Sequence, residues 1–247
     1  LALMELDRTS PVWKNVKQIE DVTLKAAELT SQLLAYSGKS EFIMQPLDVT
    51  ELIHEMMNLI KVSIPKNIRI MYNCINGMPF VRGDPVQMRQ VLMNLVINAA
   101  EAIGKDKGTI TIGTDARTCR QDFFSGCVIR DEMNPGEYVC ITVRYTGCGM
   151  TEEVAGRIFD PFFTTKTNGH GLGMAVVRGV VKGHGGSIKV SSIVGRGTEF
   201  MVLLPAVSQG VAGSDHEVEG HSNLPPGGVV LVVDDDEVVR TVASRIL

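Results

Sequence analysis

Residues 145–174 read YTGCGMTEEVAGRIFDPFFTTKTNGHGLGM, and this stretch decides the fold. An apolar run that predicts a β-strand at Tyr138–Arg144 precedes it, and a helical pattern at Met174–Lys182 continues it. Two glycine-rich turns lie inside the stretch, at 146–149 and 169–173. Glycines let a backbone approach a flat ligand closely, and N–H groups at a helix start bind phosphate oxygens. The stretch therefore predicts a ligand-binding strand–loop–helix unit, although each turn alone equally fits an ordinary connection.

Between the two turns, Ile158–Lys166 combines three phenylalanines with two threonines and a lysine. This composition suits a hinged lid over a polyphosphate, or a loop that is simply anchored by its aromatic side chains. Upstream, the sequence NLVINAAEA at 94–102 lies on a predicted helix that Asp84 caps. Asn94 and Asn98 are one helical turn apart and project from one face. Their amide oxygens suit Mg²⁺ that is also held by phosphates, although two solvated asparagines would fit as well.

The surrounding region alternates between strand and helix patterns. Further strands are predicted at 68–75, 80–82, 109–114, 187–192 and 199–204, and helices at 50–64 and 85–103. This alternation predicts an α/β two-layer sandwich with a mixed sheet. We expect the domain to span residues 43–205.

The N-terminal region carries a heptad seam from Val12 to Tyr36, which predicts a helix of a bundle or coiled coil. Residues 1–6 are expected to end a preceding helix. Residues 1–42 would then be the remaining part of a helical hairpin, which needs a second copy to bury its seam. A single amphipathic helix that packs on its own domain is the alternative.

The C-terminal region contains two segments that differ in composition from the sandwich and from each other. Residues 206–228 are rich in Gly, Ser, Pro and acidic residues, which predicts a linker. Residues 229–247 form an apolar strand, an acidic triplet and the start of a helix, too little to bury a core. We therefore expect the start of a second domain, and a chain that is a piece of a longer protein at both ends.

The composition excludes several classes of function. The net charge of −4 argues against direct binding of nucleic acid, and no apolar run is long enough for a membrane segment. The five cysteines are scattered and form no CxxC, which indicates free thiols in a reducing compartment. We expect a cytoplasmic location without a signal peptide, while membrane attachment of a longer protein stays open.

In their order and spacing, the motifs at 94–102, 145–150, 158–166 and 169–174 resemble the N box, first glycine box, F box and second glycine box of sensor histidine kinases in the GHKL superfamily. Residues 195–200 resemble the final glycine box of the same family. The resemblance implies a Bergerat-type ATP-binding fold. It further implies that residues 1–42 belong to the dimerisation and histidine-phosphotransfer hairpin, and that residues 229–247 begin a fused receiver domain.

The function implied is that of the catalytic domain of a two-component sensor histidine kinase, which passes the γ-phosphate of ATP to a histidine for relay to a receiver aspartate. The implied cofactors are ATP and Mg²⁺, and the implied partners are a second copy, through residues 12–36, and a receiver domain or response regulator. Asn98 would coordinate the Mg²⁺, with Asn94 nearby. The other implied site residues are Gly147 and Gly149 at the adenine, Lys166, Gly169, His170, Gly171, Leu172 and Gly173 at the lid and phosphates, Thr198 at the adenine edge, and Asp234 and Asp235 in the receiver metal site.

Two features depart from the family pattern. The first glycine box normally begins with an aspartate that accepts a hydrogen bond from the adenine amino group, and here that position is Tyr145. Loss of such a charge-assisted bond costs roughly 1.5–3 kcal/mol. The phospho-acceptor histidine is also absent. His54, in HEMMN, fits a loose acceptor pattern, but it lies on the first helix of the sandwich, where we expect an ordinary surface histidine.

Two alternative functions stay open. A GHKL ATPase of the gyrase, chaperone or mismatch-repair type resembles this chain in fold, but it carries a water-activating glutamate where Asn94 stands. An amide cannot act as a general base, which favours the kinase. The other alternative is a degenerate dimerisation module that no longer binds nucleotide, and Tyr145 is its support.

Overall fold

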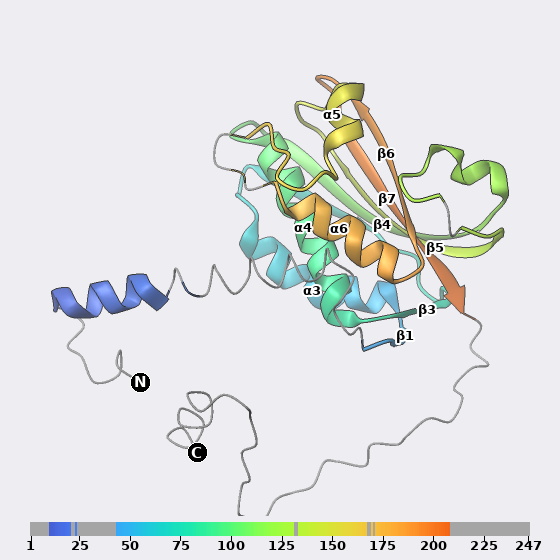
Figure 1. Cartoon of the computed structure of the whole chain (residues 1–247), viewed down its shortest axis with the longest axis horizontal. Coiled ribbons are helices and arrows are strands. Elements are labelled where there is room, and N and C mark those ends of the chain that lie inside the picture. The colour runs from blue at the N-terminus through green and yellow to red at the C-terminus, as the bar shows by residue number, and fades with distance from the viewer. Residues whose placement is uncertain are drawn as a thin grey trace, which may run out of the picture. The chain divides into compact units, whose positions relative to one another are not determined.

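The computed structural model describes residues 10–20, 23, 43–130, 133–166, 169 and 171–207 (Figure 1). Residues 11–20 are helical, and Val12 and Ile19 of the predicted seam are exposed there. The rest of the predicted hairpin, most of the linker and the receiver start lie outside the described residues. None of the described helices is long and apolar enough to cross a membrane.

One mixed sheet forms the centre of the domain. Its strands are β1 Gln45–Leu47, β2 Ile68–Asn73, β3 Phe80–Gly83, β4 Gly108–Cys119, β5 Gly136–Tyr145, β6 Ser187–Ile193 and β7 Gly197–Val207. They follow the order β1-β3-β7-β5-β4-β2, and β6 also pairs with β7. The β2–β4 pair is parallel and the other pairs are antiparallel. The predicted mixed sheet is therefore confirmed.

The domain ends later than predicted. The boundary was expected at residue 205, but β7 continues to Val207 and pairs Ala206 and Val207 with β3. The backbone groups of these two residues have partners in the sheet, so residues 206–207 belong to the sandwich and not to the linker.

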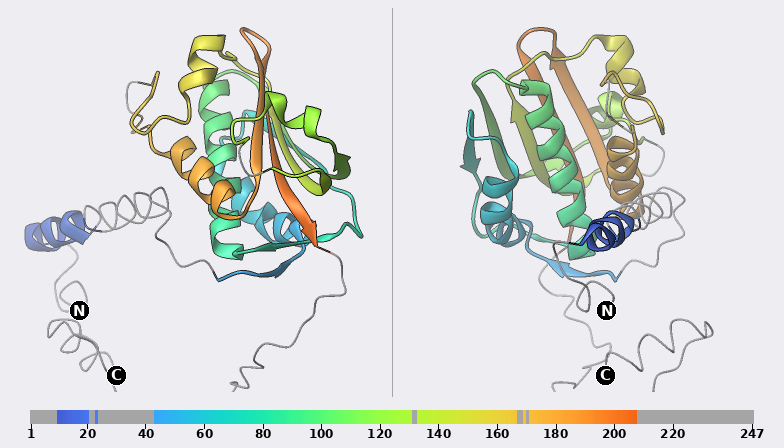
Figure 2. Two further views of the ribbon diagram at one scale, coloured as in Figure 1. Left: turned by 45° about the vertical axis from the view of Figure 1, so that its right-hand side comes forward. Right: turned by 90° about the vertical axis from the view of Figure 1, so that its left-hand side faces the viewer.

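Three helices cover one face of the sheet (Figures 1 and 2): α3 Val49–Ser63, α4 Pro85–Ile103 and α6 Gly173–Gly183. The Asp84 carboxylate accepts from the N–H groups of Val86 and Gln87 and starts α4 as predicted. Gly104 ends α4 with a φ of 68°, a conformation that favours glycine. The two-layer sandwich is confirmed. The short helix α5 Glu152–Arg157 and strand β1 were not predicted.

The main core lies between this helical layer and the sheet. Its fully buried side chains include Ile53, Ile60, Leu92, Leu95, Ile110, Ile112, Val177, Ile188 and Phe200. Burial of such side chains contributes about 1.5–3 kcal/mol each before the entropy cost of folding. His54 lies on the exposed face of α3, as expected of an ordinary surface histidine. The core thus fixes α4 and α6 against the sheet, and with them the segments that carry the motifs.

The connection between β4 and β5 covers part of the opposite face of the sheet. It contains the 3₁₀ helix η1 Gln121–Gly126, whose Phe124 packs edge-on against Tyr138 at 5.5 Å. The buried thiols of Cys119, Cys127 and Cys140 belong to the same small cluster. Farther along, the N–H of Val128 donates to the carbonyl of Ile188 at 2.8 Å. The connection therefore protects the outer edge of β6, where only a loop was expected.

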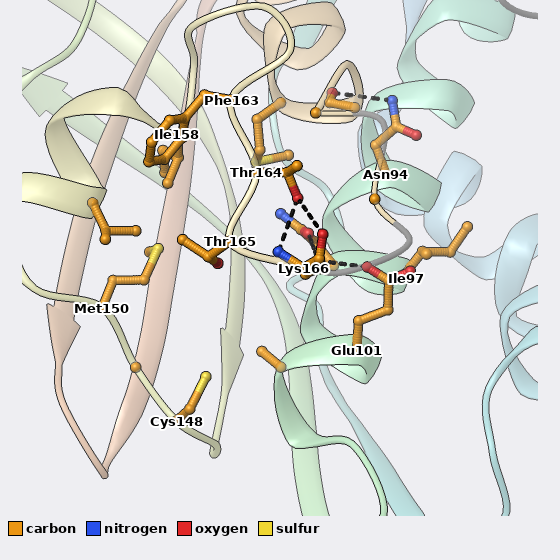
Figure 3. A pocket seen from close by; sticks show the side chains of 18 of the residues that line it. Asn94, Ile97, Glu101, Cys148, Met150, Ile158, Phe163, Thr164, Thr165 and Lys166 are labelled. Carbon is orange, nitrogen blue, oxygen red and sulfur yellow. Dashed lines mark hydrogen bonds and ion pairs between the residues drawn. The ribbon is translucent and has the colours of Figure 1, made fainter.

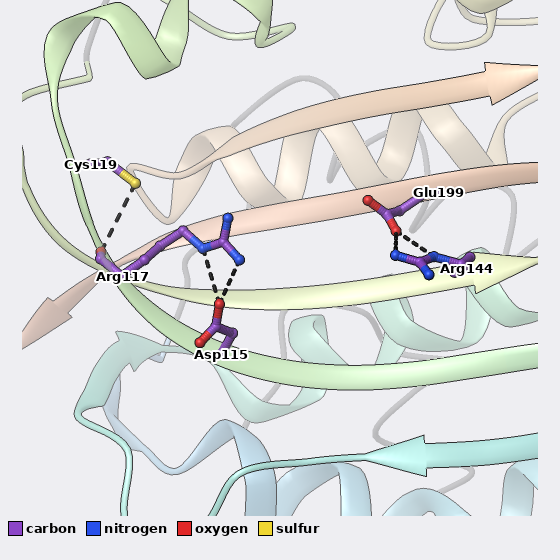
Figure 4. Close-up of polar contacts among 5 residues, drawn as sticks. All are labelled: Asp115, Arg117, Cys119, Arg144 and Glu199. Carbon is purple, nitrogen blue, oxygen red and sulfur yellow. Dashed lines mark hydrogen bonds and ion pairs between the residues drawn. The ribbon is translucent and has the colours of Figure 1, made fainter.

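Elsewhere this face is polar (Figure 4). On β4, Arg117 donates to the Asp115 carboxylate from Nη2 at 2.5 Å and from Nε at 3.1 Å. Across β5 and β7, Arg144 Nε donates to Glu199 Oε2 at 2.6 Å. These side chains are substantially exposed, so each pair contributes at most about 1 kcal/mol.

Candidate functional site

An open cavity of about 660 Å³ lies where α4, the end of β5, the loop 158–172 and the start of α6 meet (Figure 3). This volume suits a small-molecule ligand. Of the predicted site residues, the cavity is lined by Asn94, Asn98, Tyr145, Gly149, Lys166, Gly169, Gly171, Leu172 and Gly173. Gly147 and Thr198 are not among its lining residues. His170, Asp234 and Asp235 lie outside the described residues.

One face of α4 forms a wall of the cavity. Asn94, Asn98 and Glu101 all line the cavity, and Figure 3 shows Asn94 and Glu101 on this helix. Asn94 Nδ2 donates to the carbonyl of Gly173 at 3.3 Å, so this amide joins α4 to the start of α6. Asn94 therefore positions the glycine-rich turn that precedes α6.

Lys166 reaches from the loop to α4. Its Nζ donates to Asn98 Oδ1 and to Glu101 Oε2, each at 2.5 Å (Figure 3). The backbone N–H of Lys166 donates to Thr164 Oγ1 at 3.1 Å, which fixes the turn that carries it. The sequence predicted Lys166 and Asn98 as separate contacts and did not single out Glu101. The spacing of Glu101 from Asn98, three residues along a helix, was the available signal.

The first N–H groups of α6 have no partner within the helix itself. Leu172 is the N-cap residue and makes no side-chain cap, while Gly173 and Met174 line the cavity. Gly171 has a φ of 69°, and a Cβ there would lie 2.5 Å from the backbone of Phe162. Free N–H groups and the positive end of a helix dipole together attract anions. This end of the cavity therefore suits a phosphate.

The first glycine turn is wedged between α4 and the β6–β7 turn. A Cβ at Gly147 would lie 2.7 Å from the carbonyl oxygen of Ala102, and one at Gly149 would lie 2.1 Å from that of Ile193. The N–H of Cys148 donates to the same Ala102 carbonyl at 3.3 Å. Gly149 thus lines the cavity. Gly147 does not line it and instead allows the turn to pack closely against the backbone of α4.

Tyr145 forms part of the cavity wall with its side chain buried. It is 5% exposed, and its ring stacks on Phe200 with centroids 6.3 Å apart. Burial raises the pKa of Tyr145, and a side-chain hydrogen bond with Thr198 acts in the opposite direction. Thr198 lies beside Tyr145 in the β5–β7 register and bonds Ser192 Oγ at 2.8 Å. Thr198 therefore stabilises the wall at Tyr145 and lies behind it.

The loop that carries Lys166 is closed at its base. The N–H of Phe162 donates to the carbonyl of Gly171 at 3.0 Å, and Phe162 has a φ of 65°. The Arg157 guanidinium lies 4.3 Å above the ring of Phe163, and Phe159 is buried in the core. Phe159 and Phe163 thereby hold the base of this loop against the rest of the domain.

Residues 83–208 match the family described as "Histidine kinase-, DNA gyrase B-, and HSP90-like ATPase". The chain belongs to this family. It is 32% identical to the sensor kinase CckA of Brucella abortus (strain 2308), over 97% of this chain and 26% of that protein. The catalytic domain of the histidine kinase ThkA is 33% identical with a TM-score of 0.53, over 68% of this chain and 97% of that one.

ThkA in complex with the response regulator protein TrrA is 28% identical to this chain with a TM-score of 0.56, over 82% of this chain and 54% of that one. Because only 26% of CckA is matched, the chain spans about a quarter of the length of that relative. The predicted family and fold are confirmed: this is a histidine-kinase-type ATPase domain.

Proposed function

We propose that this chain is the ATP-binding catalytic part of a sensor histidine kinase. It would hold MgATP so that the γ-phosphate is transferred to a histidine on a helical hairpin and then relayed to a receiver aspartate. The observation that carries the proposal is the convergence of three groups on one cavity: the Asn98 amide oxygen, the N–H groups at the start of α6 and the Lys166 ammonium. Together they provide metal, phosphate and charge contacts for a triphosphate.

The cavity has an apolar end and a polar end. Met150, Val154 and Ile158 line the apolar end beside Tyr145 and suit a purine base. The polar end consists of the α6 start, Asn98 and Lys166, and suits the phosphates. A nucleotide would therefore lie between them, with its base near Tyr145 and its phosphates near Gly173.

The residues present fit Mg²⁺. The Asn98 amide oxygen already holds a cation, the Lys166 ammonium, so it faces the cavity and is a hard ligand. Among the described residues, no three His, Cys, Asp or Glu side chains come together around a metal, so the nucleotide would complete the coordination. Bound Mg²⁺ would neutralise phosphate charge during transfer.

Transfer by this site would depend on positioning and electrostatics. The α6 N–H groups would orient the phosphates, and Lys166 would donate to them. Asn94 supports transfer to a histidine over hydrolysis, because its side chain is an amide engaged with Gly173 and cannot activate water.

The partners are proposed on the same basis. We infer dimerisation through residues 12–36 and a phosphoryl acceptor in a receiver domain or response regulator, as in the complex of ThkA with TrrA. The proposed divisions are a hairpin remnant at 1–42, the catalytic domain from 43 to 207 and a receiver start at 229–247, where Asp234 and Asp235 would bind Mg²⁺. The unpaired cysteines support a reducing cytoplasm as its location.

Calorimetric titration of MgATP into the chain tests the proposal. We expect saturable binding, and Asn98→Ala should weaken it by about tenfold or more, equivalent to about 1.4 kcal/mol. Asn58→Ala on the exposed face of α3 is the matched control and should leave the affinity unchanged. No heat of binding to the folded parent chain would contradict the proposal and favour the degenerate module, and equal affinity of Asn98→Ala would also count against it.

A further inference from the structure

Two oxygens of α4 hold the Lys166 ammonium inside the cavity. Asn98 Oδ1 and Glu101 Oε2 each accept from Nζ at 2.5 Å (Figure 3). Asn98 and Glu101 are three residues apart, so both oxygens project from one face of the helix. An amide oxygen and a carboxylate oxygen that share one cation form a cation seat, which the lysine fills here.

The chemistry of this seat also suits a divalent cation. Carboxylate and amide oxygens are hard ligands of the kind that Mg²⁺ and Mn²⁺ bind. A divalent cation and the Lys166 ammonium compete for Asn98 Oδ1, because a double and a single positive charge about 4 Å apart repel by about 2 kcal/mol even at the dielectric of water, and by more in a partly enclosed cavity. A divalent cation and the Lys166 ammonium therefore exclude each other from the seat.

We propose that Asn98 and Glu101 form a cation seat in which the Lys166 ammonium and a divalent cation replace each other. When the metal enters, the ammonium is released toward the phosphates, where its three N–H donors have acceptors. This release rests on the proposed function, whereas the seat itself does not. Glu101 is thus a positioning residue for Lys166 and a ligand of the metal that replaces it.

The backbone around Lys166 is held on both sides. Thr164 Oγ1 accepts from the N–H of Lys166 at 3.1 Å, and the Lys166 carbonyl accepts from the N–H of Gly169 at 3.4 Å. The exchange therefore requires rotation of a long side chain, which is 36% exposed, and leaves the turn intact.

The test is Mn²⁺ binding to the chain without nucleotide, measured by electron paramagnetic resonance. Lys166→Met should tighten Mn²⁺ binding by about threefold or more, because it frees the seat. Adding Glu101→Gln to Lys166→Met should return the affinity to that of the parent. Arg117→Met is the matched control, since it frees the Asp115 carboxylate from an ion pair of similar exposure without an adjacent amide ligand.

The proposal is overturned if Lys166→Met binds Mn²⁺ no more tightly than Arg117→Met, or if the gain survives Glu101→Gln. Circular dichroism confirms that each variant is folded. Failure of the proposed function is separable, because it would appear as absent MgATP binding while the Mn²⁺ gain of Lys166→Met remains. Binding of MgATP through Asn98 without any Mn²⁺ gain would reject the seat alone.

Discussion

At the scale of single residues, Tyr145 is the feature that separates this chain from the family pattern. Its ring is buried and stacks on Phe200. The wall therefore tolerates the tyrosine without closing the cavity. What it lacks is a buried carboxylate at the base end: among the described lining residues, Glu101 is the only acid, and it is engaged with Lys166.

Replacing Tyr145 with aspartate should restore selectivity for adenine. We expect Tyr145→Asp to bind MgATP about tenfold more tightly than the parent, equivalent to about 1.4 kcal/mol, with no gain for MgGTP. The reason is that a carboxylate only accepts hydrogen bonds, and the adenine amino group is a donor. Calorimetric titration of both nucleotides measures the effect.

Tyr145→Phe is the control, because it keeps the stacked ring and removes the hydroxyl. It should bind MgATP as the parent does. If Tyr145→Asp gains nothing while Tyr145→Phe loses affinity, the hydroxyl has taken over the role of the carboxylate, and the expectation is wrong. Urea unfolding shows whether each variant is folded, which matters because Tyr145→Asp removes a buried ring.

Most individual site residues could be predicted because their types and spacings are themselves informative. Asn98, Gly149 and Gly171 lie at the cavity as expected. Glu101 was missed because its pairing with Lys166, 65 residues farther along the chain, is a tertiary contact, and its position three residues after Asn98 was the only local signal. Thr198 pairs with Tyr145 in the sheet and does not itself line the cavity, a placement that depends on strand register, which local sequence patterns do not determine.

At the scale of elements, the junction between α4 and α6 depends on a buried histidine. His184 Nε2 accepts from the N–H of Asp84 at 2.9 Å, and His184 Nδ1 contacts the carbonyl of Val180 at 2.7 Å. Because Nε2 must accept, Nδ1 carries the proton of the neutral ring. Burial lowers the pKa of His184 below its usual value of 6.5. The fold therefore requires the neutral ring.

This arrangement predicts a pH-dependent stability. The unfolded chain binds a proton at His184 below about pH 6.5, whereas the folded chain resists it, so the free energy of unfolding falls as the pH drops below that value. His184→Gln should cost about 1–2 kcal/mol at pH 8 and make this fall shallower. Urea unfolding at pH 8 and pH 5.5 measures both effects.

His54→Gln, on the exposed face of α3, is the matched control and should keep the pH dependence of the parent. Carboxylates contribute equally to the loss of unfolding free energy in all variants, so the difference between variants reports on His184 alone. A His184→Gln variant that loses as much stability as the parent between the two pH values would show that another group carries the effect.

The bounds of elements with strong local sequence signals were predicted closely. Elements with weak local signals were not predicted. Asp84 and Gly104 mark the ends of α4 because capping chemistry is local. Strand β1 and helix α5 are too short to show a period. The 3₁₀ helix η1 and the contact of Val128 with β6 were not predicted, because they depend on tertiary pairing with Ile188.

At the scale of the whole domain, the sheet order brings together motifs that are distant in the sequence. The N box lies on α4, and the first glycine box, the F box and the second glycine box lie between β5 and α6, yet α4, β5 and α6 all border one cavity (Figures 1 and 3). The alternation of strands and helices predicted two layers. The sheet order could not be predicted from it, because β7 pairs with strands from both halves of the domain.

The central claim is that this cavity binds MgATP, with the metal on Asn98. The most direct measurement is a crystal structure of the chain with Mg²⁺ and a non-hydrolysable ATP analogue. We expect the base beside Tyr145, the phosphates at the start of α6, Mg²⁺ on Asn98 Oδ1 and Lys166 turned away from that oxygen. A nucleotide bound elsewhere, with Lys166 still bonded to Asn98, would contradict the account.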